Sequence, residues 1–349
     1  MTAPSARRGR ADRPVVRLSG PGDVVEALPY LVGFVPQDSV VVVALAGSRH
    51  QVVLTARVDI AEDPVCALAP AWQAATAEGA DSVLIVVFDD AAGGVPLPHA
   101  GVVGRLMAHA RGHRLAVHDA LCVGSARYWS YMCHEPACCP VEGRTVPIRG
   151  GVAAELVYSG QSVVGSREQL RAEFALDEVR ARRIAALLPA AGHVGDRRWS
   201  VSEQIAYLDA WVDADDRLGR PDVDLVRAIR ALQDVAVRDA QLLDRGAEGD
   251  RAAGQLWGGL AQVSPAPWRA VPLTLLAICA YRRGDGARAN VAAEAAMAAD
   301  AAYPLARLVA QALACAVSPR LLTEPLDQAA RDRRSAAAGL RVADGGGGG

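Results

Sequence analysis

The chain has 349 residues, enough for about two domains, and 51% of them are hydrophobic, which is ample for a folded core. The net charge of −2 gives no reason to expect a nucleic acid or an anionic membrane as a partner. All 37 basic residues are arginines, so functions that need a lysine are excluded. These include a Walker A phosphate loop, a Schiff base and a Ser-x-x-Lys acylation motif.

The two ends of the chain differ in composition from its middle. Residues 1–13 are polar and basic and lack the apolar stretch of a secretory signal, so we predict a disordered arm. Residues 321–349 end in a run of glycines and are predicted to be a flexible tail. No apolar run reaches the length of a membrane-spanning helix. We therefore expect a cytoplasmic protein with no membrane association, whose seven cysteines are kept reduced.

Residues 14–195 are predicted to form an α/β domain with a mixed sheet. The continuous β-branched run Ser39–Leu45 is typical of a strand buried on both faces, and residues 51–60 follow it as a hairpin partner. Ser82–Phe88 is a second such run. Helices are predicted at about 64–78 and 98–110, and further strands at 115–124 and 127–133. Strands and helices that alternate in this way indicate layers of helix on sheet.

Residues 196–320 are predicted to form an all-helical domain. Helices are expected near 201–216, 222–234, 251–263, 268–283, 286–299 and 304–316. The last three are similar to tetratricopeptide hairpins, with small side chains at Ala277, Ala289 and Ala296 for close packing. Because about three repeats are needed for a solenoid, we interpret them as a helical cap. Two interpretations of this cap stay open, a plain helical core and a groove that binds a protein partner.

Four stretches of the chain together resemble one family. They are "PYLVGFVPQDSVVVVAL" (29–45), "YWSYMCHEPACCPVEG" (128–143), "VRDAQLL" (237–243) and "AYRRGDGARANVAAEAAM" (280–297). The chain is similar over residues 14–319 to domain-of-unknown-function family 4192 of actinobacteria. The resemblance implies an actinobacterial cytoplasmic protein, in keeping with the absence of lysine. It implies no catalytic residues, because the family has no assigned activity.

The block around Pro136 gathers cysteines, histidine and acids within a few residues. Zinc takes four ligands, and adjacent residues rarely both bind one tetrahedral ion. We therefore count Cys133 with either Cys138 or Cys139, and His134 as a candidate third ligand. A fourth ligand would come from His118 or Asp119. The candidate metal ligands are Cys133, His134, Cys138 and Cys139.

Besides a metal site, three interpretations of this block stay open. The thiols could form a reversible disulfide, one could act as a catalytic nucleophile, or all three could simply pack in a tight loop. We favour packing, so zinc is considered as a cofactor but not favoured. The expectation is that the three cysteines lie close together, with at least two of them largely buried.

Carboxylates at the ends of predicted strands suggest an enzyme. Asp59, Asp89 and Asp90 follow strands, and ligands of open α/β sheets bind outside the carboxyl ends of strands. With Arg127, they are the candidate catalytic residues for a hydrolytic or nucleotide-related activity. Aspartate also ends strands and caps helices without any catalytic role.

The function that we expect is that of a binding or regulatory module, acting through protein partners at its C-terminal helices. The alternatives are an enzyme that uses the carboxylates of the strand ends, and a zinc or thiol site at the Cys133–Cys139 loop.

Overall fold

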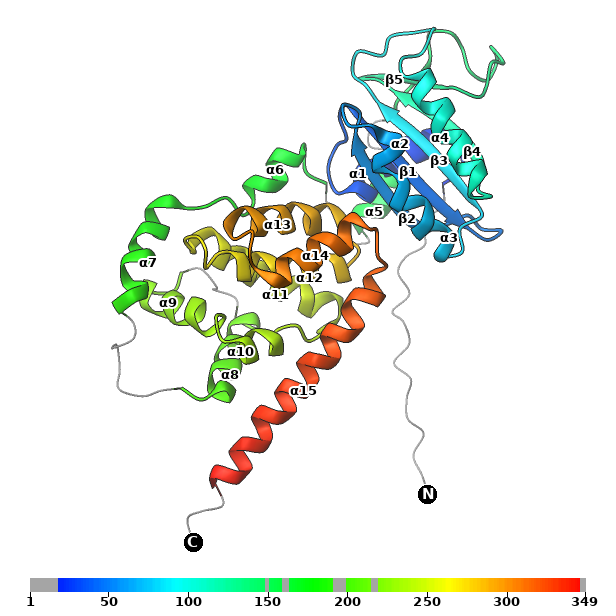
Figure 1. Ribbon diagram of the computed structural model, residues 1–349. Coiled ribbons are helices and arrows are strands. Elements are labelled where there is room, and N and C mark those ends of the chain that lie inside the picture. The colour runs from blue at the N-terminus through cyan, green and yellow to red at the C-terminus, as the bar shows by residue number, and fades with distance from the viewer. Residues whose placement is uncertain (1–17, 148–150, 159–162, 191–198, 215–218, 346–349) are drawn as a thin grey trace, which may run out of the picture. The chain divides into compact units, whose positions relative to one another are not determined.

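A computed structural model describes residues 18–147, 151–158, 163–190, 199–214 and 219–345 (Figure 1). The chain forms two compact units, residues 1–165 and 166–349. The division therefore falls before the predicted boundary between residues 195 and 196, which lies outside the described residues. The segment 166–190 belongs to the second unit instead of the first, because it is helical and packs with the helices that follow it. The predicted arm at residues 1–13 also lies outside the described residues.

The first unit is built on a mixed sheet, as predicted, and the sheet has six strands in the order β2-β1-β3-β4-β5-β6. The strands are β1 (Ser39–Ala46), β2 (Gln51–Asp59), β3 (Ser82–Phe88), β4 (Ala116–Val123), β5 (Arg127–Ser130) and β6 (Arg144–Thr145). Only β3 and β4 pair in parallel among these strands, and the remaining neighbours are antiparallel. The predicted central position of the two β-branched runs is confirmed, because β1 and β3 lie side by side and are almost wholly buried.

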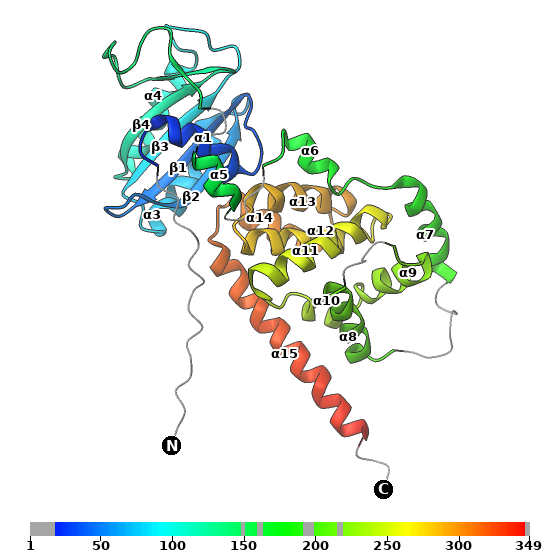
Figure 2. The same ribbon diagram turned by 180° about the vertical axis from the view of Figure 1, so that it is seen from behind.

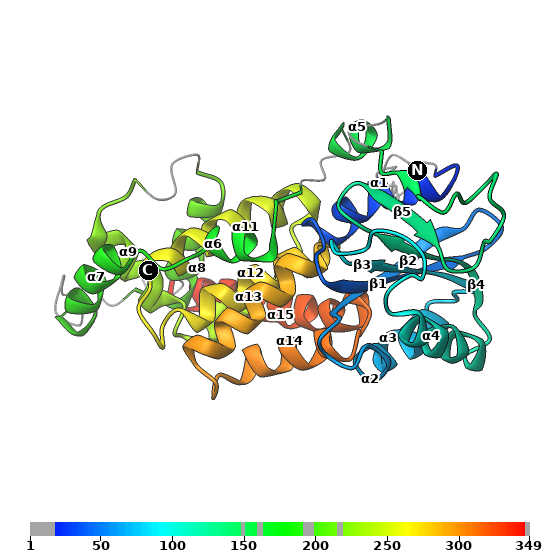
Figure 3. The same cartoon turned by 90° about the horizontal axis from the view of Figure 1, so that it is seen from above.

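Helices cover both faces of this sheet, as the edge-on view in Figure 3 shows. One face is packed by α2 (Pro64–Ala67), α3 (Ala69–Ala77) and α4 (Ala100–Gly112), and the other carries α1 (Pro21–Val32) with α5 (Gly151–Tyr158). Alternate residues of the strands point to the first face, where Val42 and Ile85 join Trp72 and Leu106 in one apolar core. This layer on both sides explains why β1 and β3 need no polar face.

The second unit consists of helices among its described residues, as predicted. They are α6 (Arg167–Ala172), α7 (Glu178–Ala190), α8 (Val201–Val212), α9 (Asp222–Ala231), α10 (Val235–Ala240), α11 (Gly246–Val263), α12 (Ala270–Arg282), α13 (Gly286–Ala299), α14 (Pro304–Ala314) and α15 (Pro319–Gly345). Several begin at the polar caps that favour a helix start, such as Ser200, which forms a capping box with Glu203. The expected close packing is confirmed, because Ala277, Ala289 and Ala296 have no exposed surface.

The predicted flexible tail is wrong for most of its length, because residues 319–345 form α15, a long helix (Figure 2). Leu322, Ala330 and Ala337 are buried at helical spacing against α8, α10 and α12. The many arginines in this segment conceal that apolar face in the sequence. Among the residues that the structure describes, no helix is both long and apolar enough to cross a membrane.

Candidate thiol site on the loop after β5

The loop between β5 and β6 is fastened to β5 near the point where it enters β6. The Arg127 guanidinium donates to the carbonyl oxygen of Gly143 at 2.8 Å, and the Trp129 indole donates to that of Val141 at 3.1 Å. Arg127, a predicted catalytic residue, therefore holds the base of the loop. Since β5 and β6 are the last strands of the sheet, the loop projects from its edge (Figure 1).

The loop brings three sulfur atoms together, which we call the thiol cluster: Cys133, Cys138 and Cys139. Their Sγ atoms all lie within 4.8 Å of one another, and those of Cys138 and Cys139 are 3.9 Å apart. The backbone N–H groups of both Cys138 and Cys139 donate to the Glu135 carbonyl oxygen, at 3.0 and 2.7 Å. Residues in such a turn are about 100° apart. The two neighbours can therefore both face Cys133, contrary to the expectation that only one would.

The cluster is more exposed than we predicted. Cys133 and Cys139 are half-buried and Cys138 is exposed, so the expectation that at least two thiols are largely buried is wrong. The reason is the position of the loop at the sheet edge, where no helix layer covers it. All three cysteines are free of disulfides. Their proximity, which was predicted, is confirmed.

Local hydrogen bonds give the thiols different acidities. The pKa of the Cys133 thiol is lowered, first because the backbone N–H of Glu135 donates to its sulfur and then because the Cys139 thiol does. Partial burial, followed by the hydrogen bonds to Cys133 and Cys138, raises the pKa of Cys139 to about 12. Of these two thiols, Cys133 is therefore the first to ionise and to become a metal ligand.

A polar contact joins the cluster to the sheet. The Ser130 hydroxyl oxygen accepts from the backbone N–H groups of Met132 and Cys133, each at 3.1 Å. The same hydroxyl donates to Oδ1 of Asp119 at 2.8 Å. Of the two candidates for a fourth ligand, Asp119 therefore lies beside the loop. His118 instead contacts His50, with their ring nitrogens 3.2 Å apart.

His134 is exposed and is not one of the residues whose ligand atoms converge. Among the described residues, the group of potential metal ligands consists of the three cysteines alone.

The carboxylates of the predicted cleft lie at the same end of the central strands. In the strand register, Asp59 and Phe88 both pair with Ser39. Asp59 and Asp89 therefore lie at the same end of the two strands that flank β1. Their side chains have separate partners. Asp59 forms an ion pair of 2.6 Å with Arg57, which lies over the Phe34 ring, on the face opposite the α3–α4 core.

The side chain of Asp89 lies on the other face of the sheet, the one that α3 and α4 cover. Its Oδ2 lies 2.9 Å from Nε2 of His99, at the start of α4. Asp90 is exposed. The strand ends therefore do not bring Asp59 and Asp89 to one point, although each is placed where predicted. His99 was missed, because nothing in the loop sequence indicates that it folds back onto the strand end.

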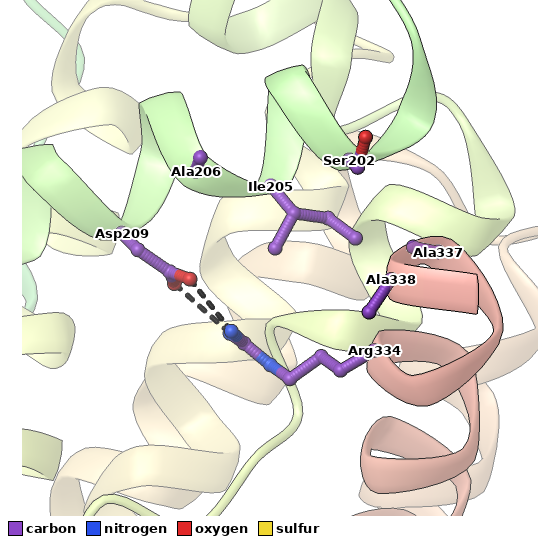
Figure 4. A pocket seen from close by; sticks show the side chains of 7 residues that line it. All are labelled: Ser202, Ile205, Ala206, Asp209, Arg334, Ala337 and Ala338. Atoms are coloured by element: carbon purple, nitrogen blue, oxygen red, sulfur yellow. Dashed lines mark hydrogen bonds and ion pairs between the residues drawn. The ribbon is translucent and has the colours of Figure 1, made fainter. Parts of the chain in front are cut away.

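Hollows that share one ion pair lie between described helices of the second unit. The first, of about 150 Å³, lies between α8 and α15 and includes Asp209 and Arg334 in its lining (Figure 4). Arg334 binds Asp209 through both guanidinium ends, at 2.6 and 2.9 Å, and Arg245 adds a third contact at 2.9 Å. Burial opposes ionisation of Asp209, but the two arginines outweigh it and lower its pKa. A second hollow, of about 390 Å³, shares this ion pair, which ties α15 to α8.

The fold and the loop together define an α/β domain with an edge thiol cluster, followed by a helical domain. A comparison with family models matches residues 21–320 to the family described as "Domain of unknown function (DUF4192)". The match covers well over half of the chain, so the protein belongs to this family, as the sequence motifs predicted. Comparisons with curated proteins and with solved structures found no match.

Proposed function

We propose that the protein binds a thiophilic metal ion, zinc in the first place, at the thiol cluster, and that it acts as a metal-dependent binding module. The observation that carries this proposal is the convergence of three Sγ atoms within 4.8 Å on one loop. Thiolates are the preferred ligands of zinc and of other soft ions.

The distance between the Cys138 and Cys139 sulfurs is close to that around a bound ion. A Zn–S bond is about 2.3 Å, so two sulfurs of a tetrahedral site are about 3.8 Å apart. The 3.9 Å between Cys138 and Cys139 is close to that value. Small movements of Cys133 would complete a three-sulfur set, because its sulfur already lies within 4.8 Å of both others.

A reversible disulfide is the second interpretation of the cluster, and the geometry favours it less. A disulfide needs two sulfurs about 2.05 Å apart, and it leaves the third without a role. An ion uses all three. Packing alone, which we favoured from the sequence, loses support because the thiols are not buried.

The remaining expectations are part of the proposal. We also propose a cytoplasmic location, which would keep the thiols reduced and able to bind an ion. The absence of lysine supports the proposed actinobacterial origin. Partner binding by α12–α14, and their likeness to tetratricopeptide hairpins, are proposed from the sequence pattern of small residues at close helix contacts.

Metal analysis of the purified protein tests the proposal. Protein prepared without a chelator, incubated with zinc and dialysed, should retain about one zinc per chain, and Cys133→Ser should lose most of it. The matched control is Cys66→Ser, because Cys66 is an exposed cysteine of the same unit, outside the cluster. Retention of zinc by Cys133→Ser, or no zinc in the wild-type protein, would contradict the proposal.

A further inference from the structure

Three thiolates leave one position of a tetrahedral ion unfilled. The candidate in the sheet for this position is Asp119, on β4. Its Oδ1 accepts from the backbone N–H of Ala120 and from the Ser130 hydroxyl, both at 2.8 Å. No described residue forms a hydrogen bond or an ion pair with its Oδ2. The carboxylate is therefore held by one oxygen and has the other available.

Asp119 is connected to the thiol cluster through Ser130. Ser130, which Asp119 holds, accepts from the backbone N–H of Cys133 and so positions that residue next to the carboxylate. A path of two hydrogen bonds through Ser130 thus connects Asp119 with Cys133.

We infer that Asp119 supplies the fourth ligand, a carboxylate oxygen, to the metal ion, so that the complete site is three sulfurs from the loop and one oxygen from the sheet. This inference rests on the proposed function. Zinc accepts carboxylate oxygen together with thiolate, whereas copper(I) selects sulfur ligands. The oxygen therefore makes the site one for a divalent ion.

The geometry also implies a movement on binding. Asp119 is not within the 4.8 Å group, so the loop must close toward β4 for Oδ2 to reach the ion. Such closure fits the exposure of Cys138 and the position of the loop at the edge of the sheet. Metal binding would then fasten the loop to the sheet at a third place, besides the contacts of Arg127 and Trp129.

The substitution Asp119→Asn isolates the proposed ligand atom. Asparagine keeps an Oδ1 that can accept from Ala120 and Ser130, and it replaces only Oδ2 by an amide nitrogen. The matched control is Glu142→Gln, because Glu142 is an exposed acid of the same loop. Unchanged thermal midpoints of the metal-free proteins establish that both variants fold.

Cobalt(II) is the probe, because its charge-transfer bands report thiolate ligands and its d–d bands report the whole ligand set. In Asp119→Asn the charge-transfer bands should persist, the d–d bands should shift, and cobalt and zinc should bind on the order of 10–100-fold more weakly. Glu142→Gln should match the wild type in all three respects.

Two results would overturn the inference and leave the proposed function intact. One is an Asp119→Asn variant with wild-type affinity and spectrum. The other is weaker binding with unchanged d–d bands, which would make Asp119 a positioning residue that acts through Ser130. A wild-type protein without cobalt thiolate bands would overturn the proposed function and this inference together.

Discussion

The polar side chains of the two units differ in their partners and in their positions. In the helical unit, carboxylates that lie between helices are held by arginines: Asp209 by Arg245 and Arg334, and Asp222 by Arg180 and Arg183. In the α/β unit, the core is an apolar layer on each side of the sheet, and the polar chemistry lies at the edge. There, among the residues that the structure describes, the thiols form their hydrogen bonds with one another and with a neighbouring backbone group.

This difference separates structural from functional candidates. A carboxylate with two arginine partners has its hydrogen-bonding capacity filled, so its role is to join helices. Three sulfur atoms that converge without a counter-charge are instead available to bind a metal ion from solution. The larger hollow in the helical unit contains an ion pair, and the thiol of lowered pKa lies on a loop at the edge of the other unit.

The largest expected effect comes from Gly143, which joins the loop to β6. Its φ is +76°, and an added Cβ would lie 2.6 Å from Nε1 of Trp129. Gly143→Ala therefore combines backbone strain with overpacking, and should lower the free energy of unfolding by about 2–5 kcal/mol in urea denaturation. Zinc affinity should fall with it, because the anchored end of the loop is displaced.

The control is Gly47→Ala in the β1–β2 turn. Gly47 has a φ of +71° but no atom within 4 Å of the added Cβ, so it bears only the backbone strain, about 1–2 kcal/mol. Equal destabilisation and equal zinc affinity in the two variants would show that the contact between Gly143 and Trp129 does not hold the loop.

The Asp250 carboxylate of the helical unit is not bound by two arginine side chains as Asp209 and Asp222 are. Asp250 is 1% exposed, and Arg282 is 4.0 Å away. Burial raises the pKa of Asp250 to about 6, against the opposing charge of Arg282. The folded chain therefore keeps this proton to a higher pH than the unfolded chain does.

Consequently, the contribution of Asp250 to stability should decrease as pH rises from about 4 to about 6, by up to about 3 kcal/mol. Unfolding free energies measured across this range should show the decrease in the wild type and in Glu248→Gln, an exposed acid on the same helix. Asp250→Asn should not show it. The same slope in all three proteins would contradict the raised pKa.

The smallest expected effect concerns the helix contacts of the second unit. Ala289 has no exposed surface, so Ala289→Leu should overpack the contact of α13 and cost about 1–3 kcal/mol. Ala298→Leu, at an exposed position of the same helix, should leave the thermal midpoint nearly unchanged. Equal midpoints for the two variants would mean that the buried face can expand without cost.

The strands and most helices could be predicted because their patterns are local. A continuous β-branched run such as Ser39–Leu45 needs cover on both faces, and the helix layers provide it. The helix α15 was missed because its apolar positions are few and stand among arginines. The position of the helix also depends on partners far away in the sequence, such as Asp209, which binds Arg334.

The three cysteines of the candidate site were predicted from the sequence, but His134 was included with them and the geometry was not predicted. The spacing of the cysteines indicated proximity. Convergence of both Cys138 and Cys139 on Cys133 depends on a turn at Glu135, which the sequence does not specify. The place of Asp119 beside Ser130 depends on strand pairing and could not be distinguished from that of His118 beforehand.

The most direct test of the thiolate metal site is X-ray absorption at the zinc edge of the zinc-loaded protein. We predict three sulfur neighbours at about 2.3 Å and one oxygen neighbour at about 2.0–2.2 Å. In Cys138→Ser, one of the three sulfur neighbours should disappear. A zinc ion surrounded by nitrogen and oxygen alone would contradict the claim that the loop of the α/β unit is a thiolate metal site.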